Sequence, residues 1–150
     1  MAKNLMVIGN LNNEPKGEAK LLRFLPVLVS AADNVGLISA NCPAEYRNKV
    51  VWIQAEHVIK KRKSYLTRII NFMLSQLKLI FLLATASQKV KYEIVMFLRP
   101  YPLAMFFARL IGKKVVRYQG GVASREPGTA GLLSRLFIEE PAAFFSHKII

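Results

Sequence analysis

Short apolar runs alternate along the chain with polar loops and with longer segments whose apolar residues recur every three or four positions. Short runs bounded by Gly, Asn and Pro are typical of buried strands, and the longer recurrence is typical of helices. Strands that alternate with helices predict an α/β domain, a Rossmann-like open parallel sheet with helices on both faces. The predicted strands are residues 4–8, 35–40, 50–55, 93–98 and 115–118, with 147–150 as the start of a sixth.

Three shorter helices are predicted between these strands. Residues 18–32 have apolar positions at helical spacing but contain Pro26, which we expect to kink or restart the helix because proline lacks the N–H that the helix uses. Residues 103–111 and 132–145 are also predicted to be helical, and the second of these is interrupted at Pro141.

The longest predicted helix, residues 64–87, is apolar around most of its circumference. Its polar positions fall within a stripe of roughly 100°, so its apolar surface needs a second cover besides the sheet. A neighbouring helix provides that cover in a core helix, and lipid provides it in an interfacial helix. Residues 69–86 are just short of the roughly 20 residues of a membrane span, so a transmembrane helix is a third interpretation. The polar stripe consists of Ser64, Thr67, Arg68, Asn71, Ser75 and Lys78.

The chain has 150 residues, a formal net charge of +13 and one cysteine. This length fits one domain with one core, and a single cysteine excludes an internal disulfide. The large positive net charge predicts an anionic partner or an anionic surface. Residues 57–125 hold fourteen Lys or Arg against one acid, Glu93, together with the most apolar segments. Basic and apolar residues together predict an anionic membrane surface as a partner, contacted by Lys60, Lys61, Arg62, Lys63, Arg68 and Lys78.

Ligands of open parallel sheets bind outside the carboxyl ends of the strands, which places the candidate residues. An arginine at such an end is suited to a phosphate, and a glycine there lets the backbone approach a ligand closely. The junction of the first loop with the first helix is a second candidate, because the N–H groups of a helix start favour an anion. The candidates for acceptor or phosphate binding are Asn10, Lys16, Gly17, Arg99, Gln119, Gly120 and Gly121.

The later part of the chain resembles a known family. The segment FARLIGKKVVRYQGG is followed by a predicted helix that contains Glu139 and then by FFSHKII. Over residues 92–150, and in the same order over residues 4–58, the chain resembles the N-terminal half of GT-B glycosyltransferases of the family-4, or group 1, type. Two features depart from the family pattern: the first loop reads GNLNNEPKG instead of carrying a close glycine pair, and Gln119 stands where the family often has a histidine.

The resemblance implies an acceptor-binding domain of a membrane-associated enzyme that transfers a sugar from a nucleotide-sugar to a lipid-linked or glycan acceptor. It also implies that the donor site lies in a C-terminal domain that this chain lacks, so no cofactor is expected in the chain itself. We therefore expect a single domain, truncated at its C-terminal end or paired with a separate donor-binding subunit. The expected location is cytoplasmic, peripheral on the inner face of the cell membrane.

Two other functions fit parts of the sequence. The pI and the run Lys60–Lys61–Arg62–Lys63 are compatible with a nucleic-acid-binding module. Such a module needs aromatic residues exposed among the basic ones. Because the aromatic residues lie within apolar runs that are predicted to be buried, nucleic acid is an unlikely partner; these residues are Phe72, Phe81, Phe97, Phe106 and Phe107. An inactive truncated product is the remaining alternative. The spacing of cysteine and histidine predicts no metal site, and the sequence assigns no catalytic residue.

Overall fold

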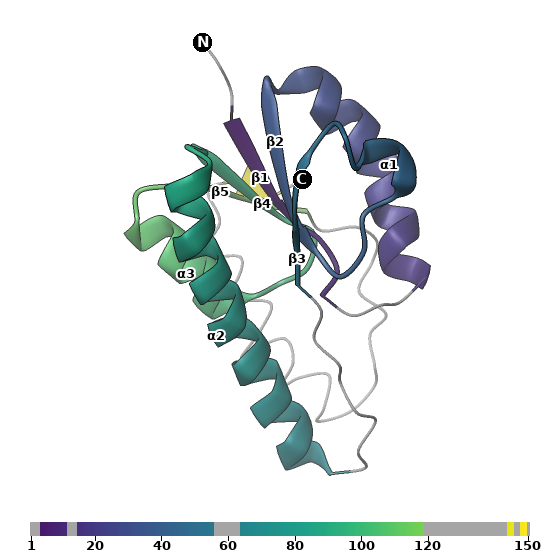
Figure 1. The fold of residues 1–150 in the computed structure, drawn as a ribbon. Helices are drawn as coiled ribbons and strands as arrows, with labels where there is room; N and C mark the ends of the chain where they lie inside the picture. Colours follow the sequence, from purple (N-terminus) through teal and green to yellow (C-terminus); the bar gives the residue numbers. More distant parts are fainter. Residues whose placement is uncertain (1–3, 12–14, 56–63, 119–143, 146–147, 150) are drawn as a thin grey trace.

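The computed structural model describes residues 4–11, 15–55, 64–118, 144–145 and 148–149. The chain forms a parallel sheet with helices on both faces, which confirms the predicted fold class (Figure 1). The elements, in chain order, are β1 (Asn4–Ile8), α1 (Pro15–Ala31), β2 (Asn34–Ser39), the short 3₁₀ helix η1 (Ala44–Tyr46), β3 (Val51–Gln54), α2 (Tyr65–Lys89), β4 (Ile94–Phe97), α3 (Pro102–Leu110), β5 (Lys114–Arg117) and β6 (Lys148–Ile149).

The strands lie in the order β3-β2-β1-β4-β5-β6, and every pair is parallel. The chain crosses from the β3 edge to the other side of β1 through α2, so β1 and β4 are neighbours at the point where the order reverses. In open sheets of this kind the space outside the carboxyl ends at that reversal is the usual ligand site. The topology thus places the β1–β4 pair at the centre of the candidate site.

One face of the sheet is covered by α2 and α3. Alternate residues of the strands point to this face, for example Met6 and Ile8 of β1 and Phe97 of β4, and they pack with Leu83 of α2 and Met105 of α3. All five side chains are fully buried. Burial of apolar surface between these layers is the main stabilising term of this half of the fold.

The other face is covered by α1 and by the segment that follows β2. Leu5 and Val7, the residues of β1 that alternate with those of the first face, pack with Leu21 and Leu25 of α1. Tyr46 of η1 closes the same cluster over the β2–β3 side. Because both faces of the central strands are buried, their sequences read as continuous apolar runs, as observed.

The first helix departs from its predicted course. It begins at Pro15, earlier than the predicted residue 18, because proline has the φ angle of a helix and lacks the N–H that a first helical residue leaves unbonded. It also continues through Pro26, which is exposed, so water can hydrate the carbonyl group that loses its helical partner. The helix predicted over residues 132–145 lies almost entirely outside the described residues. The sixth strand is present as Lys148–Ile149.

The long helix α2 is much longer than the strands on which it packs. Its 25 residues correspond to about 37 Å, whereas the four residues of β4 span about 13 Å. Its buried residues lie in its middle and C-terminal part, from Ser75 to Ala86. The N-terminal turns extend past the carboxyl edge of the sheet, as Figure 1 shows.

Tyr92, just before β4, ties that strand to α2. Its hydroxyl donates a hydrogen bond of 2.8 Å to the carbonyl oxygen of Leu83, and the Lys113 ammonium lies 4.9 Å from the centre of its ring. Burial raises the pKa of Tyr92 to about 12. The neutral phenol is thus the form that the fold stabilises.

This pKa predicts a dependence of stability on alkaline pH. The unfolded chain loses the phenol proton near pH 10 and the folded chain near pH 12, so the contribution is complete below pH 10 and is lost between pH 10 and about 12. Urea unfolding across this window is expected to show a steeper fall in stability for the wild type than for Tyr92→Phe. Parallel curves for the two proteins would contradict the prediction. At neutral pH the variant is expected to lose about 1 kcal/mol with the hydrogen bond.

Candidate functional site

The carboxyl ends of β1 and β4 bring two of the predicted residues together. Ile8 pairs with Phe97 in the sheet, and the N–H of Leu98 donates a 3.0 Å hydrogen bond to the carbonyl oxygen of Ile8. Asn10 and Arg99 each follow this pair by two residues, so they occupy equivalent places on neighbouring strands. Adjacent strands are about 4.8 Å apart. The two residues therefore lie side by side at the carboxyl edge.

The residues after β1 are held in place by β2 and α1. The backbone of Gly9 donates to Ile38 (2.9 Å), and the carbonyl oxygen of Asn10 accepts from Ala40 (2.9 Å). A side chain at Gly9 would place its Cβ 3.0 Å from Cβ of Ser39 and 3.2 Å from the Leu21 side chain, which is too close for an ordinary contact. Glycine therefore lets α1 approach the end of β1 without a shift of Ser39 or Leu21. Asn10 is itself buried.

The β5 strand contributes a buried arginine to the same edge. Arg117 is paired with Phe97 and is only 4% exposed. Tyr118 follows it, donates from its N–H to the carbonyl oxygen of Phe97 (2.9 Å), and packs edge-on against Phe24 of α1. The predicted site residues Gln119, Gly120 and Gly121 come next in the chain and lie outside the described residues.

The loop after β4 is anchored to the middle of α2. The ring of Tyr101 stacks on Phe72 with centroids 6.3 Å apart, and the side-chain oxygen of Gln76 accepts a 2.8 Å hydrogen bond from the N–H of Leu103. The buried Gln76 thereby satisfies one of the N–H groups that the start of α3 leaves without a helical partner. These contacts fix the position of Arg99 relative to α2.

The remaining predicted phosphate residues lie at the start of α1. Lys16 and Gly17 belong to its first turn and not to the preceding loop, because the helix begins at Pro15. That turn is at the carboxyl edge, and the binding of an anion there stays a prediction. The four residues Lys60, Lys61, Arg62 and Lys63 lie outside the described part of the chain, whereas Arg68 and Lys78 are exposed residues of α2.

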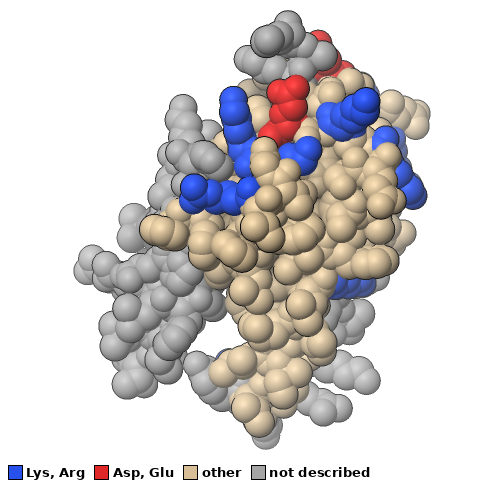
Figure 2. Space-filling model, turned by 90° about the vertical axis from the view of Figure 1, so that its left-hand side faces the viewer, with Lys and Arg blue, Asp and Glu red and all other residues tan. Residues whose placement is uncertain are grey.

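A broad apolar area covers the outer side of α2 and α3. We call it the α2–α3 surface and define it by its exposed apolar residues. The sequence predicted that Phe81 and Phe106 are buried, and this is wrong: Phe81 is 67% exposed and Phe106 is 47% exposed, although the ring of Phe106 also contacts that of Phe145, with centroids 5.1 Å apart. Figure 2 shows this side as a largely uncharged area. The surface consists of Leu66, Ile69, Ile70, Met73, Leu74, Leu77, Phe81, Leu103, Phe106, Leu110 and Ile111.

Basic residues border the α2–α3 surface. In Figure 2 most of the Lys and Arg side chains lie together toward one end of this side. In sequence, the basic residues of this part of the chain occur at or just after the ends of α2 and α3 and at the start of β5, and all but Lys113 are exposed. Glu93 is the described acid closest to them in sequence. The border residues are Lys89, Lys91, Arg109, Lys113 and Lys114.

Within the described residues, one helix, Leu66–Lys89, is long and apolar enough to cross a membrane. It packs Leu79, Leu83 and Ala86 onto the sheet without any exposure. A core helix that has one covered and one open side passes the same test of length and composition. The structure confirms the core-helix interpretation for the inner side of α2, whose outer side is apolar and exposed, and the interfacial interpretation stays a prediction.

The described residues contain one cysteine, which is buried. They contain no group of three His, Cys, Asp or Glu that could hold a metal ion. Cys42 is buried behind β2, and burial raises the pKa of its thiol while the nearby Arg47 guanidinium partly opposes that shift. A buried thiol with a raised pKa is a weak nucleophile.

The sheet order, the helices on both faces and the carboxyl-edge site define a Rossmann-like domain with the fold of GT-B glycosyltransferases. Solved structures with this fold include the glycotransferase of kitacinnamycin, which matches with a TM-score of 0.66 and 10% sequence identity. The match covers 97% of this chain and 38% of that protein. They also include MurG of Acinetobacter baumannii, with a TM-score of 0.53 and 11% identity, where the match covers 98% of this chain and 40% of MurG. A UDP-N-acetylglucosamine 2-epimerase matches with a TM-score of 0.58 and 11% identity, over 100% of this chain and 42% of the epimerase.

These likenesses concern the fold alone, because the identities are close to those of unrelated sequences. The chain spans about two fifths of the length of each of these three structures. No protein-family model and no curated protein matches the sequence. The family-4 type expected from the sequence therefore stays a prediction.

Proposed function

We propose that the chain is the acceptor-binding, N-terminal domain of a membrane-associated GT-B glycosyltransferase of the family-4 type. In this proposal it holds a lipid-linked or glycan acceptor, and a second domain, in the same or another polypeptide, binds the nucleotide-sugar donor. The observation that carries the proposal is the α2–α3 surface, which lies on the helix that extends past the carboxyl edge. An uncovered apolar surface beside a ligand site suits a substrate that is itself anchored in lipid.

Membrane association is supported by the charges around that surface. An apolar area bordered by lysine and arginine matches the interface of an anionic membrane, where the apolar residues enter the acyl boundary and the cations meet head groups. Lys89 and Arg109 border it on the described side, and the Lys60–Lys63 run directly precedes α2 in sequence. We propose a peripheral position on the cytoplasmic side, with α2 lying along the membrane and not across it.

The acceptor site is proposed at the carboxyl ends of β1 and β4. Asn10 offers an amide to hydroxyl or phosphate groups, and Arg99 offers a guanidinium to a phosphate. The first turn of α1, with Lys16 and Gly17, adds N–H groups at the same edge. No residue is assigned to the chemical step, since the donor groups that complete the site belong to the second domain.

A nucleotide-sugar epimerase is the second candidate, because a UDP-N-acetylglucosamine 2-epimerase shares the fold over the whole chain. An epimerase has no lipid acceptor and no need of an exposed apolar area. The α2–α3 surface therefore favours the glycosyltransferase.

Titration calorimetry with two ligands tests the proposal. The purified chain is expected to bind farnesyl phosphate, a short analogue of a lipid-linked acceptor, and to show no heat with UDP at the same concentrations. Arg99→Ala is expected to weaken farnesyl phosphate binding about tenfold or more, the usual value of a charge-assisted hydrogen bond. Binding of UDP without farnesyl phosphate, or sugar transfer by the isolated chain, would contradict the assignment of an acceptor domain that needs a donor half.

A further inference from the structure

The helix α2 has three distinct sides. Its inner side packs on the sheet through Leu79, Leu83 and Ala86, and its outer side carries most of the α2–α3 surface. A polar stripe adjoins the inner side, because Arg68, Asn71, Ser75 and Lys78 recur at steps of three and four residues and consecutive residues are about 100° apart; Ser75 of this stripe is buried, whereas Arg68 and Lys78 are exposed. Arg68 and Lys78 therefore do not share the centre of the apolar side, although both were predicted as membrane contacts.

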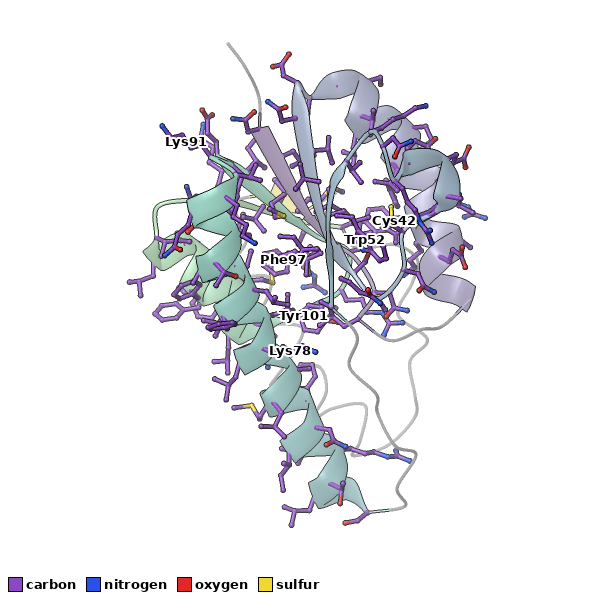
Figure 3. All side chains as sticks on the ribbon, in the orientation of Figure 1. Cys42, Trp52, Lys78, Lys91, Phe97 and Tyr101 are labelled. Carbon is purple, nitrogen blue, oxygen red and sulfur yellow. The ribbon has the colours of Figure 1, made fainter. Side chains whose placement is uncertain are left out.

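Lys78 points from α2 into the space in front of the carboxyl edge. Figure 3 shows its side chain on the side of the helix that faces the sheet ends, beneath Tyr101 and away from the apolar outer side. The neighbouring turns of α2 are fixed by the Phe72–Tyr101 stacking and by the Gln76–Leu103 hydrogen bond. The base of Lys78 is thus held rigidly relative to the loop that contains Arg99.

The charges at this edge are predominantly positive in the described residues. Arg99 follows β4 and Arg117 ends β5. Of the described acids, Asp33 and Glu93 lie at the opposite, amino edge, Glu45 lies on η1, and Glu18 lies in the first turn of α1, at the carboxyl edge but across the sheet from α2. A phosphate between α2 and the carboxyl ends would meet cations from two layers of the fold.

We infer that Lys78, together with Arg99 and Asn10, binds the phosphate group of a polyisoprenoid-phosphate acceptor. The inference rests on the proposed function and assigns a ligand to one side of α2 while the other side contacts the membrane. On the helix surface, Lys78 is next to Leu74 and Phe81, at the edge of the apolar side. The phosphate of a lipid can therefore reach Lys78 while the acyl or isoprenoid chain of that lipid stays in the membrane.

The test compares Lys78→Gln with Lys49→Gln, which removes one positive charge from the opposite layer, where no site is proposed. Three probes are used with the full chain: farnesyl phosphate, farnesol, and phosphatidylcholine vesicles that contain phosphatidylglycerol. Lys78→Gln is expected to bind farnesyl phosphate about tenfold less tightly. Its affinity for farnesol and its partition onto the vesicles are expected to stay within about twofold of the wild type. The control variant Lys49→Gln is expected to stay within about twofold of the wild type with all three probes.

Two outcomes would overturn the inference, and they are distinguishable. If wild type binds farnesyl phosphate and Lys78→Gln binds it equally well but partitions less onto the anionic vesicles, Lys78 is a membrane contact and the proposed function stands. If wild type binds neither farnesyl phosphate nor farnesol, both the inference and the acceptor-binding function fail. Circular dichroism of each variant checks that α2 is intact.

Discussion

Replacement of Leu74, Leu77 and Phe81 by serine is expected to lower the partition of the chain onto phosphatidylglycerol-containing vesicles roughly 100-fold. Each side chain is about half exposed or more, so transfer of its exposed part into the membrane contributes about 1 kcal/mol. Three such losses sum to about 3 kcal/mol, and each 1.4 kcal/mol is about a factor of ten. Vesicle co-sedimentation at increasing lipid concentration measures the change.

The matched control replaces three exposed apolar residues outside the α2–α3 surface, Leu22, Val27 and Val51, by serine. These residues lie on α1 and β3 and have similar exposure, so the control removes the same kind of surface from a place where no membrane contact is proposed. Its partition is expected to equal that of the wild type. Equal losses in the two triple variants would show that binding follows overall hydrophobicity and not the α2–α3 surface.

The second large effect concerns stability. Phe97→Ala is expected to lower the free energy of unfolding by about 3–5 kcal/mol, because it leaves a cavity at the centre of the core. Phe97 is fully buried on β4, between β1 and β5, and packs beneath α2 and α3 (Figure 3). A loss of this size is a large share of the stability of a domain. Urea unfolding at neutral pH provides the measurement.

The same substitution at an exposed position is the control. Phe81→Ala removes an identical side chain that is 67% exposed, and its effect on the free energy of unfolding is expected to stay within about 0.5 kcal/mol. If both variants lose several kcal/mol, Phe81 has a packing partner in the folded protein. If neither does, β4 is not the central strand of the core.

The strands were predictable because their signal is local. β1, β2 and β4 are short apolar runs that end at glycine or polar residues, and burial on both faces requires that pattern. The limits of α1 were less predictable, since Pro15 and Pro26 are compatible with either a loop or a helix. Only the packing of Leu21 and Leu25 on the sheet makes the continuous helix the lower free-energy choice.

The candidate site was predictable in part. Asn10 and Arg99 were selected because each follows a strand, and the register of β1 with β4 places them side by side. The sequence could not show that Arg117 is buried or that Gly9 is needed for the contact with α1, because both depend on residues far away in the chain. Membrane contact by Lys78 was predicted from basic and apolar residues occurring together, and it stays a prediction.

By itself the sequence determined the class of fold, since alternating apolar runs and helical periods leave a parallel α/β sheet as the arrangement that buries them. It also determined that α2 has more apolar surface than one neighbour can cover. Only the tertiary structure decided which side of α2 is covered. Leu79, Leu83 and Phe81 are equally apolar in sequence, but the sheet lies on one side of the helix alone, so burial separates them. Which apolar residues form a core and which form a surface depends on contacts between distant segments, and these exist only in the folded chain.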